Sequence, residues 1–123
     1  MSSTVLLVED ELLVRELASE DLAEVGFEVM AANDGDEALT ILRDGGRFDL
    51  LFTDIRMPGV TDGWDLAREA RTLIPNLKVI FATGLGDPGE QLAEGERYVR
   101  KPYSLKDLQT VLGELGFAEG SSA

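Results

Sequence analysis

The sequence of 123 residues contains neither cysteine nor histidine. Without cysteine there is no disulfide framework, no thiol nucleophile and no sulfur ligand for a metal ion. Without histidine there is no imidazole to serve as a general base or as a nitrogen ligand. These two absences exclude serine-histidine triads and zinc sites.

Long apolar runs and positive charge are also scarce. No apolar run is long enough to span a bilayer, and the N-terminus lacks the basic and hydrophobic segments of a signal peptide, so we expect a cytoplasmic protein. Only 11 basic residues accompany 24 acidic ones, which gives a formal net charge of -13. This charge repels phosphate backbones and anionic lipids, and we expect neither direct nucleic-acid binding nor membrane insertion.

Short apolar runs alternate with amphipathic stretches along a length that fits one domain, expected over residues 1–117 with a loose tail over residues 118–123. The runs predict strands at residues 4–8, 27–32, 48–53, 78–83 and 97–100. Helical spacing and capping residues predict helices at residues 11–25, 34–44, 64–73 and 104–115, with at most a short helix within residues 87–95. This alternation predicts an α/β fold whose mostly parallel sheet is covered on both faces.

Polar residues end four of the predicted strands. Glu9 and Asp10 follow the first strand, Asp54 follows the third, Thr83 ends the fourth and Lys101 follows the fifth. In such sheets the functional site lies at the carboxyl ends of the strands, so we expect these side chains to meet. Three carboxylates in one place repel one another unless a divalent cation neutralises them, and oxygen ligands suit Mg2+.

A carboxylate can itself be a nucleophile toward a phosphoryl group when nearby positive charge stabilises the transfer. Asp54, on the central strand, is best placed for that role, and Glu9 with Asp10 is better suited to hold the metal. Lys101 offers a fixed positive charge, and Thr83 offers a hydroxyl donor.

Four segments together resemble the signature segments of response-regulator receiver domains. They are VEDE at residues 8–11, TDIRMPG at 53–59, FATG at 81–84 and YVRKPY at 98–103, in the family's order and over nearly the whole chain. The resemblance implies a flavodoxin-like (βα)5 doubly wound sheet of five parallel strands in the order 2-1-3-4-5. It also implies a phosphoacceptor of a two-component phosphorelay rather than an enzyme, one that assists its own aspartyl phosphorylation and dephosphorylation.

By this resemblance Asp54 accepts a phosphoryl group from the phosphohistidine of a sensor histidine kinase or a histidine phosphotransfer protein. Asp10, Asp54 and the backbone carbonyl of Arg56 hold Mg2+, for which Mn2+ can substitute, and Glu9 contributes through water. The downstream target is a further protein that the sequence does not identify.

The resemblance also assigns residues to the phosphoryl group and to a conformational switch. Lys101 and Thr83 contact the phosphoryl group, and Tyr98 is the aromatic residue whose rotamer follows Thr83.

Two departures from the family pattern affect the expected shape. The stretch at residues 60–63 is one residue longer than the commonest form, so the loop beside Asp54 is expected to have its own conformation. The interval from Thr83 to Lys101 is about one helical turn shorter than usual and rich in glycine, so the fourth helix is expected to be short or mobile.

Each site residue also has a structural alternative. Asp54 can cap backbone amides at a strand end, Thr83 can be an ordinary strand residue, Lys101 a surface lysine and Tyr98 a ring packed at the sheet edge.

Other functions remain open beside the active receiver. A flavin or nucleotide binder would share the fold, but the acidic residues at 9–11 would repel its phosphate. A receiver-like interaction scaffold that no longer accepts phosphate would normally have lost Asp54, Lys101 or an acidic partner. The chain is expected to be a stand-alone receiver, with the receiver segment of a hybrid histidine kinase as the alternative.

Overall fold

The computed structural model describes residues 3–56, 59, 61–84 and 92–117, and all structural statements below concern these residues. Alternating strands and helices run along them. The elements are β1 (Ser3–Val8), α1 (Leu12–Glu24), β2 (Phe27–Ala32), α2 (Gly35–Arg43), β3 (Leu50–Asp54), α3 (Gly63–Leu73), β4 (Lys78–Thr83), β5 (Glu96–Arg100) and α4 (Leu105–Glu114).

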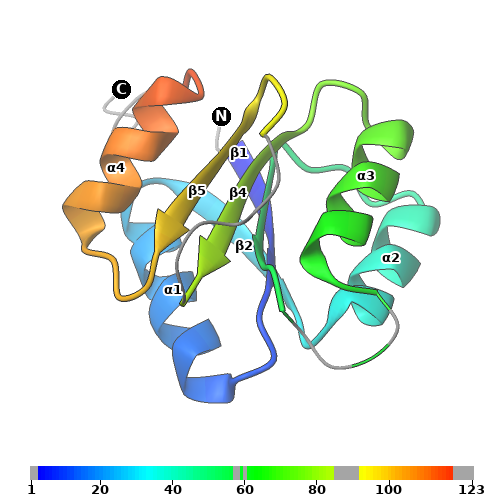
Figure 1. Cartoon of the computed structure of the whole chain (residues 1–123), viewed down its shortest axis with the longest axis horizontal. Coiled ribbons are helices and arrows are strands. Elements are labelled where there is room, and N and C mark those ends of the chain that lie inside the picture. Colours follow the sequence, from blue (N-terminus) through cyan, green and yellow to red (C-terminus); the bar gives the residue numbers. More distant parts are fainter. Residues whose placement is uncertain (1–2, 57–58, 60, 85–91, 118–123) are drawn as a thin grey trace.

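The five strands form one parallel sheet in the order β2-β1-β3-β4-β5. The predicted strand order is therefore confirmed. Helices α1 and α4 cover one face of the sheet, and α2 and α3 cover the other (Figure 1). All carboxyl ends of the strands consequently lie at one rim, which is where the predicted site residues are expected.

The central strands are apolar because the sheet is covered on both sides. Successive residues of β1 point to opposite faces, so Val5 and Leu7 join the core beneath α1 and α4, whereas Leu6 and Val8 join the core beneath α2 and α3. These four side chains are at most 1% exposed. The rigid double core fixes the strand ends that carry the polar residues.

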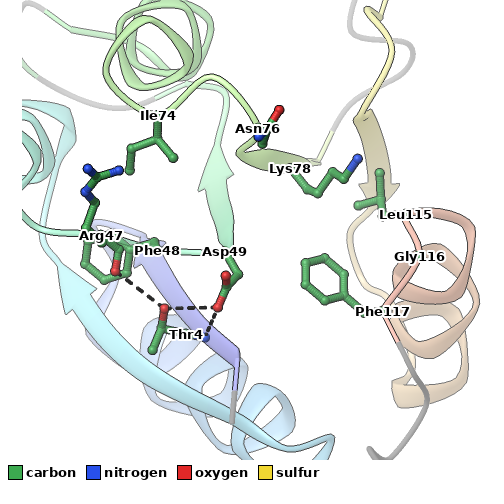
Figure 2. A pocket seen from close by; sticks show the side chains of 10 residues that line it. All are labelled: Thr4, Arg47, Phe48, Asp49, Ile74, Asn76, Lys78, Leu115, Gly116 and Phe117. Atoms are coloured by element: carbon green, nitrogen blue, oxygen red, sulfur yellow. Dashed lines mark hydrogen bonds between the residues drawn. The ribbon is translucent and has the colours of Figure 1, made fainter. Parts of the chain in front are cut away.

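The third strand begins at Leu50, two residues later than predicted, and ends at Asp54. The carboxylate of Asp49 turns back toward β1, where it accepts hydrogen bonds from the amide of Thr4 at 2.8 Å and from its hydroxyl at 3.3 Å (Figure 2). An amide that bonds to a side chain is not available to a strand ladder, which explains the later start. The corrected end places Asp54 itself as the last residue of the strand.

Capping residues fix the beginnings of α2 and α4 as predicted. Asp34 accepts a hydrogen bond from the amide of Glu37 at the start of α2, although the carboxylate of Glu37 bonds to the amide of Asn33 rather than to that of Asp34. Ser104 and Asp107 form a reciprocal capping box at the start of α4.

Two expectations lie wholly or largely outside the described residues. Residues 85–91 include most of the stretch at 87–95 in which the fourth helix was predicted. The rest of that stretch, residues 92–95, is not helical and contains a turn at 94–95. The tail at residues 118–123 is also outside them. Among the helices that are described, none has the length and apolar character needed to cross a membrane.

Candidate functional site

Three carboxylates meet at the carboxyl rim of the sheet. Ligand oxygens of Glu9, Asp10 and Asp54 all lie within 4.8 Å of one another. Glu9 and Asp10 directly follow β1, and Asp54 ends β3, which pairs with β1. Glu9 is only 5% exposed, whereas Asp10 is exposed to solvent. The predicted convergence of these residues is therefore confirmed, and the cluster is open to solvent on one side.

The ammonium group of Lys101 completes the cluster from the end of β5. Its Nζ lies 2.9 Å from Oε1 of Glu9 and 3.0 Å from Oδ1 of Asp54. The backbone of Lys101 is held as well, because its amide donates a 2.7 Å hydrogen bond to the carbonyl of Thr83. Lys101 is thus a directed side chain and not a free surface lysine.

The electrostatics of the cluster make the ionised form of Asp54 less favourable than that of an ordinary aspartate. Burial, followed by the negative charge of Glu9, raises the pKa of Asp54 to about 6, although the hydrogen bond from Lys101 opposes the shift. Burial alone lowers the pKa of Lys101, but its hydrogen bonds to Glu9 and Asp54 outweigh burial and raise that pKa. Lys101 therefore stays charged while the three carboxylates remain only partly compensated.

A hard divalent cation fits this donor set. The carboxylate oxygens lie within 4.8 Å of one another, and oxygen is the ligand atom that Mg2+ prefers. The single positive charge of Lys101 does not balance the negative charges of three carboxylates. Arg56, whose carbonyl is the predicted third direct protein ligand, lies in the exposed bend that follows Asp54.

Two supporting contacts were not anticipated from the sequence. Arg15, on α1, donates a 2.9 Å hydrogen bond from its guanidinium to the backbone carbonyl of Glu9. The amide of Glu11 donates to Oε2 of Glu9 at 3.1 Å. Both contacts fix the segment that carries Glu9 and Asp10. Neither the spacing nor the periodicity of the sequence signals the contact of Arg15.

Thr83 and Tyr98 lie on adjacent strands and share one face of the sheet. Asp54 pairs with Ala82, so Thr83 stands one residue beyond the level of Asp54 on β4. Phe81 pairs with Tyr98, and because side chains alternate along a strand, Thr83 shares the face of Phe81 and Tyr98. Thr83 is buried, and the ring of Tyr98 is partly buried against the core beneath α2 and α3.

One surface hollow lies apart from the carboxylate cluster, and another borders the cluster through Lys101. A cavity of about 500 Å³ opens at the opposite end of the sheet, near the beginnings of β1 and β4, and is lined by Thr4 and Lys78 (Figure 2). A second, of about 480 Å³, lies between β5 and α4 and includes Lys101 in its lining. The carboxylates themselves are at a polar rim, as suits an ion and a small anionic group rather than an enclosed organic cofactor.

Comparison with known proteins agrees with this geometry. A model of the response regulator receiver domain matches residues 5–113. The sensor kinase CckA of Brucella abortus is 39% identical over 119 residues, which cover 93% of this chain and 12% of that protein. The response regulator receiver protein CpdR of Brucella abortus is 34% identical over 108 residues, which cover 85% of this chain and 88% of that protein.

Solved structures give the same result. The response regulator protein TrrA of Thermotoga maritima, in complex with Mg2+-BeF, superposes with a TM-score of 0.80 at 33% identity and covers 94% of this chain and 99% of its own. This chain spans less than half the length of some curated relatives and only 12% of the sensor kinase CckA.

Proposed function

Because the chain belongs to the family of response regulator receiver domains of two-component systems, we propose that Asp54 is the residue that accepts the phosphoryl group. Receiver domains are signalling phosphoacceptors and not enzymes in the usual sense. The observation that carries the proposal is the position of the Asp54 carboxylate, which lies among two further carboxylates and one ammonium group at the sheet rim.

In the proposed reaction an Asp54 carboxylate oxygen attacks the phosphorus of a phosphohistidine. The new O–P bond forms as the P–N bond breaks, and the electron pair of that bond returns to the imidazole of the donor. Attack requires ionised Asp54, and the neighbouring Lys101 supports that state by its hydrogen bond. Lys101 and the hydroxyl of Thr83 then contact the phosphoryl oxygens.

Asp10, Asp54 and the backbone carbonyl of Arg56 would hold Mg2+, and Glu9 would contribute through water. When bound, the ion neutralises charge on the carboxylates and on the transferred group. Mn2+ would substitute because it takes the same oxygen ligands. The same groups would serve dephosphorylation by water, so the domain assists both the gain and the loss of its phosphoryl group.

The signal would leave the site through Thr83 and Tyr98. When the Thr83 hydroxyl moves toward the phosphoryl group, it changes the space available to side chains on its face of the sheet. Tyr98 shares that face and is partly buried there, so its ring would adjust to the change by taking another rotamer.

The phosphodonor is proposed to be a sensor histidine kinase or a histidine phosphotransfer protein, and the reaction to take place in the cytoplasm. Helix α1 begins beside the carboxylates and exposes Leu13 and Leu17, whose exposed fractions are 73% and 63%. Two leucines one turn apart on one helix form an apolar contact for a donor that must reach Asp54. Whether a stand-alone protein or a segment of a hybrid kinase, the domain would meet its donor through this surface.

Incubation with acetyl phosphate, followed by intact mass measurement, tests the proposal. The wild type should gain one phosphoryl group with Mg2+ and none in the presence of a chelator. Asp54→Asn should gain none, whereas Asp49→Asn, at the opposite end of the sheet, should behave like the wild type. A folded wild type that stays unmodified would favour the alternative of an interaction scaffold that accepts no phosphate.

A further inference from the structure

The loop that follows the acceptor strand is fastened to the first turn of α2 through Thr61. The hydroxyl of Thr61 donates a 2.8 Å hydrogen bond to Oδ1 of Asp36. The two residues lie far apart along the chain, and neither belongs to the carboxylate cluster. The bond therefore joins the acceptor loop to an element that carries none of the proposed site residues.

The main chain of Thr61 is also packed tightly against α2. A Cβ atom on Gly35, the first residue of that helix, would lie 2.6 Å from the carbonyl oxygen of Thr61 and 3.0 Å from its Cβ and Cγ2. Only glycine permits this approach. Thr61 thus uses both branches of its side chain, with the methyl group against Gly35 and the hydroxyl on Asp36.

Both ends of the loop are fixed at the end of β3. The amide of Gly63 donates a 2.8 Å hydrogen bond to the carbonyl of Ile55. A Cβ atom on Gly63 would lie 2.3 Å from the carbonyl oxygen of Asp54, so the start of α3 rests directly on the acceptor strand. Arg56 follows Ile55 directly and lies between these fixed ends.

We propose that Thr61 is a positioning residue of the phosphorylation site, which acts by holding the acceptor loop so that the carbonyl of Arg56 faces the carboxylates. This inference rests on the proposed function, in which that carbonyl is a Mg2+ ligand. Hydrogen bonds behind a metal ligand orient it, and their removal weakens metal binding. A loop one residue longer than the commonest receiver form has a particular need for such a restraint.

The test compares Thr61→Val, which removes the hydroxyl at constant shape, with Thr61→Ser, which keeps it. Mg2+ affinity is read from the fluorescence of Trp64, the only tryptophan in the chain and the second residue of α3. Thr61→Val should weaken Mg2+ binding on the order of tenfold, and Thr61→Ser should stay near the wild type. Thr72→Val is the matched control, since its hydroxyl bonds only within α3, to the carbonyl of Arg68.

A second pair of variants changes Asp36, the acceptor of the hydrogen bond from Thr61. Asp36→Asn keeps an acceptor oxygen and should retain most of the affinity, whereas Asp36→Ala should match Thr61→Val, and the double variant should lose no more than either alone. These variants also serve if Thr61→Val fails to fold.

The outcomes separate this inference from the proposed function. If the wild type binds Mg2+ and is phosphorylated but Thr61→Val binds the ion equally well, the positioning role is overturned and the function stands. An equal loss in Thr61→Ser and Thr61→Val also overturns it, because the hydroxyl would then be irrelevant. A wild type that binds no Mg2+ overturns both.

Discussion

The ammonium group of Lys101 lies 3.0 Å from the carboxylate of Asp54, although β4 separates β3, which ends at Asp54, from β5, which Lys101 follows. The contact is made at the rim, where the lysine side chain reaches across the end of β4. The same ammonium group is 2.9 Å from Glu9. One cation is therefore shared by two carboxylates.

Lys101→Ala should retain Mg2+ binding but lose most of the phosphoryl-dependent change. The lysine contacts the proposed adduct rather than the ion, so its removal spares the metal ligands. Titration of Trp64 fluorescence with Mg2+, and then with Mg2+ and beryllium fluoride as a phosphoryl mimic, measures the two properties separately. Lys106→Ala, an exposed lysine of α4, is the control. A full response to the mimic in Lys101→Ala would remove Lys101 from the mechanism.

Stability without metal should fall as the pH rises through the titration of Asp54. The pKa of its carboxyl is about 6 in the folded protein, against an ordinary value of 3.8. Between these values the folded protein keeps a proton that the unfolded chain has lost, so the free energy of unfolding decreases with increasing pH.

The consequence is measurable with Asp54→Asn in the presence of a chelator. Near pH 7 this variant should exceed the wild type in free energy of unfolding by on the order of 1 kcal/mol, allowing for solvent screening at the partly exposed site. The difference should shrink as the pH falls toward about 4. Urea unfolding at several pH values would contradict this account if the variant were the less stable protein near pH 7.

Gly63→Ala should destabilise the fold and disturb the acceptor loop. Its new methyl group would meet two backbone atoms, the Asp54 carbonyl oxygen at 2.3 Å and the Ile55 Cα at 2.8 Å, neither of which can rotate away. We expect a loss of about 1–3 kcal/mol in urea unfolding. Gly113→Ala in α4 meets nothing within 4 Å and should instead be neutral or slightly stabilising. Equal effects of the two substitutions would refute the close approach at Gly63.

Replacing both Leu13 and Leu17 with serine should impair phosphotransfer from a protein donor but not from acetyl phosphate. The two leucines lie outside the core, so the substitutions leave the site intact while removing apolar contact area. Transfer rates from purified phosphorylated kinases or phosphotransfer proteins of the source organism measure the effect. Leu73→Ser, on α3, is the control and should transfer normally. If the double variant also lost its reactivity toward acetyl phosphate, the leucines would be needed for the fold and not for contact with the donor.

The sequence predicted the order and type of the elements because apolar runs and capping residues are local signals. Strand order was not readable from the same signals and came from the resemblance of the segments around Asp54 and Lys101. The start of β3 was misplaced because Phe48 extends the apolar pattern, whereas the actual boundary depends on a contact between Asp49 and Thr4.

The site could be predicted where its residues end strands, since parallel strands bring their carboxyl ends to one rim. The contacts that support it could not. Arg15 on the Glu9 carbonyl and Thr61 on Asp36 join helices and loops by single hydrogen bonds, and neither pairing follows from spacing or periodicity. Such bonds depend on how the elements are arranged in three dimensions. The sequence pattern gives only the order of the elements along the chain.

The central claim is that the Asp54 carboxylate itself becomes phosphorylated. Borohydride reduction of the protein after incubation with acetyl phosphate and Mg2+ converts an aspartyl phosphate into homoserine, and peptide mass spectrometry then locates it. The account predicts homoserine at position 54 and at no other acidic residue. Conversion at Asp10, or no conversion in folded protein with Mg2+ present, would contradict it.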